Sequence, residues 1–367
     1  MDQNLIYKIG LTLIPKIGPV ISKNLLSHCG SAEAVFSESK KTLTKVPGVG
    51  TTLAKNILTQ NVLKIAEKEI FRIKKSDIQP LFYTDKAYPS RLKHYNDSPL
   101  MIYCKGPADL NNFRMVSVVG TRSPSPSGIS FCEKLINDLK KLEVTVVSGM
   151  AYGVDIAAHK TCLEHDIPTI GVLGHGLGTI YPSQHWATAH KMIDEGALIT
   201  EFLYDVKPER ANFPMRNRII AGMCDALVVV ETKRKGGSMI TAELANSYNK
   251  DVFAVPGRLK DENSKGCNHL IKTHQAALIE SGKDIAYVMG WDEKAEYENN
   301  RLQQSLFTTL KDEEFEVVSV LKQNENLGID SLYQKIKMSP GALSSTLLTL
   351  EFKGLIKSLP GKRYTLV

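Results

Sequence analysis

Two short loops in the middle of the chain carry the residue types that bind phosphate groups. Each loop follows an apolar run of strand length: Gly120, Thr121 and Arg122 come after residues 115–119, and Ser148 and Gly149 come after residues 144–147. Backbone amides in such loops, and at the start of the helices that follow them, attract anions. An arginine can add two parallel hydrogen bonds to a phosphate group. These loops therefore predict a phosphate-binding site.

Two later segments extend the same chemistry. Residues 213–218 read Phe-Pro-Met-Arg-Asn-Arg, and residues 233–238 read Lys-Arg-Lys-Gly-Gly-Ser at the expected start of a helix. Glycine amides, a serine hydroxyl and the positive end of a helix all favour phosphate. A further glycine-rich loop, residues 174–178, has the spacing GxGxG, which by itself indicates only a tight turn. Together these loops predict a groove for a phosphate backbone, in which Phe213 is a candidate base-stacking face as well as a candidate core residue.

The elements that position these loops follow from the alternation of apolar runs with helical segments between residues 114 and 289. The expected strands are residues 115–119, 144–147, 169–173, 197–201, 226–231, 252–255 and 277–279. This alternation predicts an α/β fold, a doubly wound parallel sheet with helices on both faces. Ligands of such sheets bind at the carboxyl ends of the strands. The residues predicted to bind phosphate there are Gly120, Thr121, Arg122, Ser148, Gly149, Phe213, Arg216, Asn217, Arg218, Gly236, Gly237 and Ser238.

Residues 1–75 predict a helical domain that precedes the core. Two similar turns, Ile14–Pro19 and Val46–Thr51, each join two short helical segments, which is typical of helix-hairpin-helix motifs. The amides of such hairpins can hold a DNA phosphate without reading sequence, whereas a role in protein contacts is an equally open alternative. DNA contact is favoured for the second hairpin. The lysines near enough in the chain to assist are Lys23, Lys45 and Lys55.

Residues 76–289 are expected to form the core domain. Its first part contains two short extended pieces, residues 79–83 and 100–105, which we expect to add strands to the edge of the sheet. Residues 290–304, which follow the core, are polar and acidic and are interpreted as a linker.

Residues 305–367 have the outline of a winged helix. Three helices are expected at residues 312–323, 329–337 and 340–353, and a hairpin with Pro-Gly at its tip at residues 355–367. Such domains bind DNA or proteins, and both alternatives stay open here. For DNA contact, the outward-facing residues would be Ser344, Ser345 and Thr346 on the third helix and Lys357, Lys362 and Arg363 on the wing.

Composition narrows the class of protein. The 367 residues carry a formal net charge of +7, which leans toward a polyanionic partner without requiring one. The six cysteines are scattered with no CxxC pair, and neither a basic-then-apolar leader nor a long apolar run is present. We therefore expect a cytoplasmic protein with no structural zinc, no disulfide framework and no membrane insertion.

Catalytic motifs are sparse. The chain has no GxxxxGK[ST] motif for nucleoside triphosphates, and Ser148 does not lie in a GxSxG elbow. Asp155 and His159 stand four residues apart, but two ligands without a third are more typical of a helix cap and a packed histidine. We therefore expect no cofactor and no metal. One enzyme hypothesis stays open, in which Glu201 acts as a general base on a bound nucleotide.

Seven segments, in chain order, resemble the DNA-processing protein A family, also called DprA or Smf. They are SVVGTR (117–122), SGMAYGVDIAAH (148–159), GVLGHGLGTIYP (171–182), FPMRNRIIAG (213–222), GGSMITAELA (236–245), VFAVPG (252–257) and GCNHLI (266–271). The resemblance implies an extended Rossmann-like core flanked by an N-terminal helical domain and a C-terminal winged helix. It further implies a non-catalytic protein that binds single-stranded DNA, protects incoming DNA in natural transformation and loads the RecA recombinase onto it.

The resemblance also implies partners and contacts. It implies a homodimer formed through the Rossmann-like domains, and a single-strand-binding protein is a further candidate partner. Arg122 would be a main phosphate contact, with Arg216, Asn217, Arg218 and the turn at residues 236–238 completing the site. Lys207, which precedes these arginines, is an additional candidate.

Two departures from the family pattern stand out. His185 replaces the asparagine usual in YPxxN. Thr273-His274-Gln275 replaces the glycine usual after GxNxLI, and because of this second change the resemblance does not define the exact dimer surface. More distantly, the same rim resembles lysine-decarboxylase-like phosphoribohydrolases, so the alternative is a hydrolase of small nucleotides with Glu201 or Glu243 as its base. A winged-helix regulator that reads duplex DNA is the third alternative.

Overall fold

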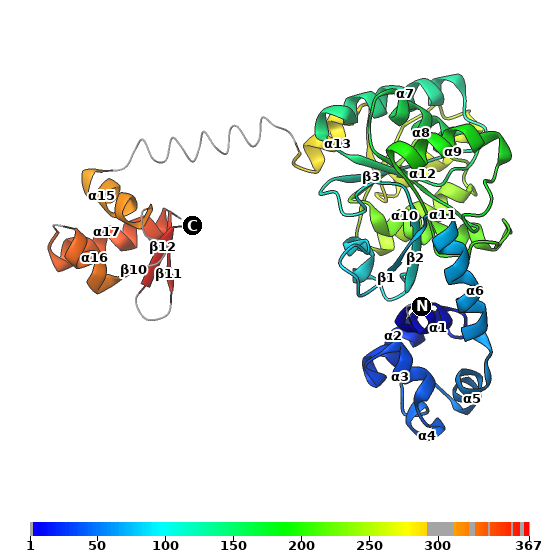
Figure 1. Ribbon diagram of the computed structural model, residues 1–367. Coiled ribbons are helices and arrows are strands. Elements are labelled where there is room, and N and C mark those ends of the chain that lie inside the picture. Colours follow the sequence, from blue (N-terminus) through cyan, green and yellow to red (C-terminus); the bar gives the residue numbers. More distant parts are fainter. Residues whose placement is uncertain are drawn as a thin grey trace. The chain divides into compact units, whose positions relative to one another are not determined.

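The computed structural model describes residues 3–291, 311–322, 327–336, 338–353, 355–359 and 363–366 (Figure 1). The chain divides into two compact units, Met1–Trp291 and Asp292–Val367. Of the predicted linker, residues 292–304 lie outside the described residues. None of the helices that the structure describes is both long enough and apolar enough to cross a membrane.

The first unit is organised around one sheet of nine strands. Seven strands are parallel, and the two edge strands β1 and β2 are antiparallel to their neighbours, in the order β1-β2-β6-β5-β4-β3-β7-β8-β9. The strands are β1 (Gln79–Phe82), β2 (Met101–Lys105), β3 (Met115–Val119), β4 (Thr145–Ser148), β5 (Thr169–Val172), β6 (Ala197–Thr200), β7 (Ala226–Val229), β8 (Asp251–Ala254) and β9 (Ala277–Leu278). The predicted parallel sheet, and the prediction that residues 79–83 and 100–105 extend its edge, are both confirmed.

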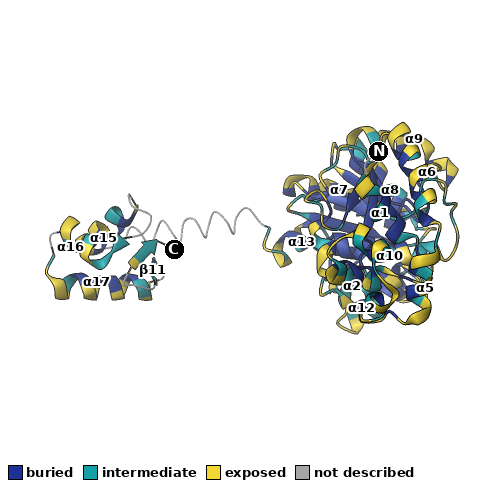
Figure 2. Ribbon diagram, turned by 60° about the horizontal axis from the view of Figure 1, so that its bottom comes forward, coloured by how far each residue is buried: buried dark blue, intermediate teal, exposed yellow. Residues whose placement is uncertain are grey.

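Helices cover both faces of this sheet, which explains why its strands are continuously apolar. In β3, Met115 and Val119 pack into one layer while Val116 and Val118 pack into the other. Figure 2 shows the interior in the colour of buried residues and the outer helix faces as exposed. One face carries α7 (Pro126–Leu139), α8 (Val154–Glu164), α9 (Trp186–Glu195) and α13 (Gly282–Val288), and the other carries α10 (Asn212–Met223), α11 (Gly237–Ser247) and α12 (Lys265–Lys272). Short 3-10 turns are η1 (Ser90–His94), η2 (Lys140–Leu142), η3 (Ser183–His185) and η4 (Glu262–Ser264).

The order of the strands reverses at β3. This strand pairs with β4 on one side and with β7 on the other, although β7 comes much later in the chain. The loops that follow β3 and β7 are therefore neighbours at the carboxyl end of the sheet, and the Thr121 amide donates to the Glu231 carbonyl at 2.7 Å. Such a reversal leaves a crevice where ligands of doubly wound folds bind.

The N-terminal helices form the two predicted helix-hairpin-helix motifs. Their turns lie between α1 and α2 and between α4 and α5. The helices share a buried core with Phe82, Met101 and Tyr103, so they are packed onto the β1–β2 edge of the sheet. The six helices are α1 (Gln3–Thr12), α2 (Pro19–Cys29), α3 (Ala32–Ser37), α4 (Lys40–Leu43), α5 (Thr51–Thr59) and α6 (Val62–Lys75).

Lys23 does not take the DNA-facing role predicted for it. Its Nζ donates to the carbonyl of Tyr95 at 2.8 Å and to the hydroxyl of Ser98 at 2.7 Å. Burial lowers the pKa of Lys23, and the nearby Asp97 carboxylate opposes that shift. The side chain therefore joins the helical segment to the core.

The second unit is a winged helix. Its third strand, β10, pairs with β12 and was not predicted, because two residues give no periodic pattern. On α17, Ser344 and Ser345 are exposed as predicted, but Thr346 is buried among Leu343, Leu347 and Leu350, so its outward orientation was wrong. The predicted hairpin tip Pro360-Gly361 and Lys362 lie outside the described residues. The elements are α15 (Asp312–Lys322), β10 (Leu327–Gly328), α16 (Ile329–Lys335), α17 (Pro340–Phe352), β11 (Ile356–Leu359) and β12 (Arg363–Leu366).

Buried His159 predicts a loss of stability in acid. Its Nδ1 lies 2.7 Å from Thr169 Oγ1, and burial, followed by the nearby His185 and Arg216, lowers its pKa to about 3. An unfolded chain would bind this proton near pH 6.5, so between these values the unfolded state holds more protons. We expect the free energy of unfolding to fall with decreasing pH by about 1.4 kcal/mol per unit for this group.

Urea unfolding of the parent and of His159→Gln at several pH values between 7 and 5 checks this expectation. The variant should show a shallower pH dependence whatever its absolute stability. An unchanged slope would mean that His159 is not the group responsible.

Candidate nucleic-acid interface

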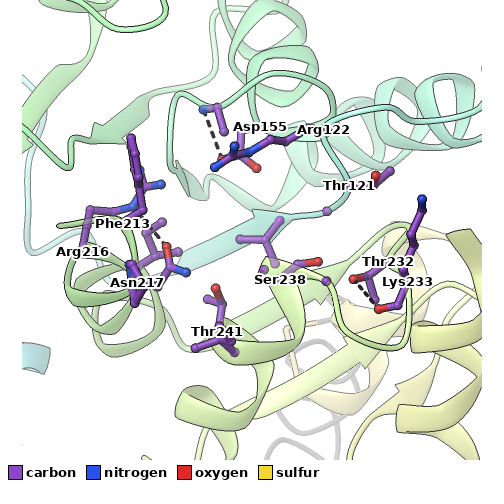
Figure 3. A pocket seen from close by; sticks show the side chains of 18 of the residues that line it. Thr121, Arg122, Asp155, Phe213, Arg216, Asn217, Thr232, Lys233, Ser238 and Thr241 are labelled. Atoms are coloured by element: carbon purple, nitrogen blue, oxygen red, sulfur yellow. Dashed lines mark hydrogen bonds between the residues drawn. The ribbon is translucent and has the colours of Figure 1, made fainter. Parts of the chain in front are cut away.

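A cavity of about 680 Å³ opens where the strand order reverses. Three chain segments form most of its lining: residues 119–122 after β3, residues 210–217 at the start of α10, and residues 232–241 around the start of α11. Figure 3 shows the labelled side chains of these segments surrounding a common space. We call this space the first cavity.

The first cavity is strongly cationic. Arg122, Arg210, Lys233 and Lys235 are exposed at its walls, and a fifth cation, Arg216, lies in its floor. Asp155 is the sole carboxylate among the described residues that line it. Five cations against one carboxylate leave a net charge of +4, which favours an anionic ligand.

The start of α11 supplies hydrogen-bond donors to the same space. Its N-cap residue is Gly236, and no described side chain caps the first turn. The hydroxyl of Ser238 is buried, with the residue 7% exposed, and it has no hydrogen-bond partner in the described part of the chain. Because buried polar groups are nearly always hydrogen-bonded, an unpartnered hydroxyl at a cavity wall indicates a ligand. Helix N-termini bind phosphate groups in this way.

Arg216 holds the floor of the first cavity together. Its Nη1 donates to the carbonyls of Gly149 and Val172, at the ends of β4 and β5, and its Nε donates to Asn217 Oδ1 at 3.2 Å. Burial lowers the pKa of Arg216 to about 10, and Asp155 opposes the shift. The guanidinium therefore stays charged at neutral pH, and the Asn217 amide nitrogen remains to donate into the cavity.

Gly149 permits this arrangement. A Cβ at this position would lie only 2.5 Å from Arg216 Nη1. Gly149, which was predicted to bind phosphate, does not line the first cavity, and its lack of a side chain makes room for Arg216.

The loop that carries Arg122 is held by close backbone packing. Gly153 has a φ of 81°, and a Cβ there would approach the Thr121 carbonyl oxygen to 2.2 Å. The Val154 amide donates to that same oxygen at 3.2 Å. From this fixed backbone the Arg122 guanidinium lies over the Phe213 ring, 5.7 Å from its centroid. Phe213 is half-buried and lines the cavity, so part of its side chain is accessible from the cavity.

Besides Gly149, three predicted site residues lie outside the first cavity. Ser148 is buried and its hydroxyl donates to the Val118 carbonyl at 2.6 Å. Arg218 forms a largely buried ion pair with Glu201. Lys207 is exposed but does not line the cavity.

The glycine-rich loop at residues 174–178 does not join the first cavity either. Its Gly176 and Gly178 amides donate to the carbonyls of Val206 and Tyr204 at 2.8 and 2.9 Å. Since these donors are already used within the chain, the prediction that this loop shares one groove with the other loops was wrong.

Among the cationic and aromatic residues of the lining, sequence reasoning missed Arg210 and Tyr181. Arg210 precedes the FPMRNR segment in an irregular stretch, so no periodicity marked it. The two carboxylates proposed as catalytic bases do not line the cavity: Glu201 is paired with Arg218, and burial raises its pKa, while Glu243 is absent from the lining.

The fold and site define a class. The protein is an extended Rossmann-like α/β protein with a cationic cavity at the reversal of its strand order, joined to helix-hairpin-helix and winged-helix modules. The family model for DNA recombination-mediator protein A matches residues 79–290, a SAM-like helix-hairpin-helix tandem matches residues 9–60, and the DprA winged helix domain matches residues 308–362. The chain belongs to the DNA recombination-mediator protein A (DprA/Smf) family.

Individual relatives support this assignment. Protein Smf of Synechocystis is 30% identical over 98% of both chains, and DNA processing protein DprA of Streptococcus pneumoniae is 40% identical over 55% of this chain and 71% of its own. The solved structure of the Streptococcus pneumoniae protein matches with a TM-score of 0.66 and 31% identity, over 78% of this chain and 98% of that one. DNA processing protein A from Helicobacter pylori, whose structure concerns its single-stranded DNA binding mode, matches with a TM-score of 0.53 and 29% identity over 58% and 95%.

The Arg218–Glu201 pair predicts a separation of stability from ligand binding. Both side chains are 12% exposed. Removing one partner of such a pair leaves an uncompensated charge, so Arg218→Met should lower the free energy of unfolding by about 3–5 kcal/mol. The double variant Glu201→Gln/Arg218→Met should recover much of that loss in urea unfolding. Equal destabilisation by the single and double variants would contradict a pairing role.

Proposed function

We propose that this protein binds single-stranded DNA through its phosphates in the first cavity and acts in DNA recombination as other DprA/Smf proteins do. The observation that carries the proposal is the unpartnered, buried Ser238 hydroxyl at the uncapped start of α11, among the cations that line the first cavity. The Helicobacter pylori relative, known for its single-stranded DNA binding mode, adds support from within the family.

The proposed contacts follow from the geometry of the first cavity. A phosphate group at the start of α11 accepts from the Ser238 hydroxyl and from the Gly237 amide. Arg122, Lys233 and Lys235 neutralise it and the adjoining phosphates from the walls, and Asn217 donates its amide. These contacts position the strand without reading its bases.

The preference for single strands has a physical basis in this proposal. A single strand is flexible enough to bend its phosphates into a recessed cavity, whereas a duplex holds its phosphates on the outside of a stiff rod. Unstacked bases also leave their faces free, and Phe213 offers a ring beside Arg122.

We propose binding rather than catalytic turnover. The carboxylate that lines the first cavity, Asp155, is buried and accepts from the Ala151 amide at 3.3 Å. A general base must reach the group it deprotonates, and neither Glu201 nor Glu243 lines the cavity. The two bases named for the hydrolase alternative are therefore not in position.

A homodimer through the Rossmann-like core is also part of the proposal. Strand β9 ends the sheet, no further strand pairs with it among the described residues, and Leu278 is 48% exposed there. Such an edge can pair with the same edge of a second copy. Two cavities on one assembly would then hold one strand with greater avidity. The residues that depart from the family pattern, 273–275, immediately precede this edge.

Protection of incoming DNA and loading of the RecA recombinase in the cytoplasm complete the proposed role. A protein that holds a strand by its phosphates leaves bases available for pairing in recombination. A single-strand-binding protein would compete for or hand over the same strand.

The winged helix favours a protein partner over duplex DNA. Direct reading of base edges uses mainly arginine, lysine, asparagine and glutamine, and α17 contains none of these. Instead, Leu348 and Phe352 are 55% and 84% exposed on it, and Phe315 of α15 is 60% exposed. The alternative of a duplex-reading regulator therefore lacks a suitable recognition helix.

Three neighbouring cations provide a matched test of the first cavity. Lys233 and Lys235 line it, whereas Arg234, which lies between them in the chain, does not. We expect Arg122→Ala to weaken binding to a labelled single-stranded oligonucleotide about tenfold, and Lys233→Ala and Lys235→Ala to weaken it less. Each lost phosphate contact should lower the slope of log affinity against log salt by about 0.7.

Fluorescence anisotropy over several salt concentrations, with a duplex competitor, measures both quantities. Arg234→Ala is the control and should bind as the parent does. Equal losses in all three neighbours would indicate only general electrostatic attraction, and tight binding of neither strand form would overturn the proposed function.

A further inference from the structure

The structure has a second cavity, of about 460 Å³, and none of the predicted phosphate-binding residues lines it. Its lining combines apolar and aromatic side chains, including Trp186, His190 and Tyr204, with one lysine, Lys105. No carboxylate is found among the described residues that line it. An aromatic, weakly cationic cavity of this kind suits a planar ring attached to a negatively charged backbone.

Trp186 is the most conspicuous member of the second cavity. It is the first residue of α9 and is 58% exposed. Its ring centroid lies 3.8 Å from that of His190, at an interplanar angle of 31°. Helix packing accounts for Ala189 and Met192, which are buried, but not for an exposed indole. Exposed aromatic side chains serve as the platforms on which bases stack in proteins that bind single strands.

One chain segment, residues 180–183, contributes to the lining of both cavities. Tyr181 lines the first cavity, while Ile180 and Ser183 line the second. Tyr181 is 47% exposed, and its ring centroid is 6.1 Å from that of Phe213, which lies beneath Arg122. A chain leaving the phosphate contacts therefore meets Phe213 and Tyr181 before it reaches the segment that borders the second cavity.

We propose that the second cavity receives nucleobases of the same single strand that the first cavity holds by its phosphates. Trp186 is the stacking platform, and Lys105 faces the phosphates of the bases bound there. This inference rests on the proposed function and extends it, since it makes base stacking at a second place part of the affinity. Because every base has a stacking face, the contact tolerates any sequence.

The two tryptophans of the chain allow a direct optical test. Trp291 packs against the α7–α8 face, with Arg114 beside its ring, so Trp291→Phe leaves Trp186 as the single reporter in the full-length protein. On titration with a labelled oligonucleotide of about 16 nucleotides, Trp186 fluorescence should be quenched in parallel with the rise in anisotropy. An abasic strand of the same length, which keeps its phosphates, should bind without this quenching.

Trp186 variants supply the second measurement. Trp186→Ala should weaken binding of the base-containing strand about tenfold and leave binding of the abasic strand unchanged, whereas Trp186→Phe should retain most of the affinity. Anisotropy that rises while Trp186 fluorescence stays constant would overturn this inference and leave the proposed function intact. Absence of binding to either strand would overturn the proposed function itself.

Discussion

The site depends on the hydrogen bonds of one buried arginine, Arg216. Arg216 of α10 donates to backbone carbonyls at the ends of two neighbouring strands, β4 and β5, and to the side chain of Asn217. Such a charge is costly to bury, and the carbonyls together with Asp155 compensate it. Because Arg216 ties α10 to the sheet, it also determines where Phe213 and Asn217 enter the first cavity. Its charge contributes to the field of the cavity from below without a direct contact being required.

The basic residues of the protein thus divide into two groups with different physical roles. Arg216, Arg218 and Lys23 are partly or wholly buried, and their hydrogen bonds join elements that are distant in the chain. Arg122 and Lys233 are exposed at the walls of the first cavity, where a ligand can displace their water. A net charge summed over the sequence cannot separate these groups, because it counts an internal tie and an external contact equally.

In the modules around the core, too, some side chains are buried or paired within the protein while others are exposed. The helix-hairpin-helix segment shares its apolar core with β1 and β2, so it is an extension of the Rossmann-like unit. In the winged helix, Glu314 and Lys353 form an ion pair at 2.7 Å that joins α15 to the end of α17, next to the exposed Phe315 and Phe352. These exposed apolar side chains are the observation behind the proposal of a protein partner for this module.

The sequence by itself determined the elements and their order, because strand and helix formation here depend on local patterns. Continuous β-branched runs such as residues 115–119 require burial on both faces, and paired Gly/Pro turns require short helices on either side. The family motifs could also be recognised from the sequence, because each is a contiguous segment. Loops after β3 and β7 could be assigned to one edge because parallel strands place their carboxyl ends together.

Only the tertiary structure decided which of these groups face a ligand. Arg216 and Arg218 are two residues apart on α10 and are of the same type. Their different positions, Arg216 beneath the cavity and Arg218 paired with Glu201, therefore follow from how α10 packs on the sheet. The amides of residues 176 and 178 look available in the sequence but are used by a strand-end loop some 26 to 30 residues later. The second cavity arises where α9, β2 and Tyr204 pack together, and no local pattern encodes a space between distant segments.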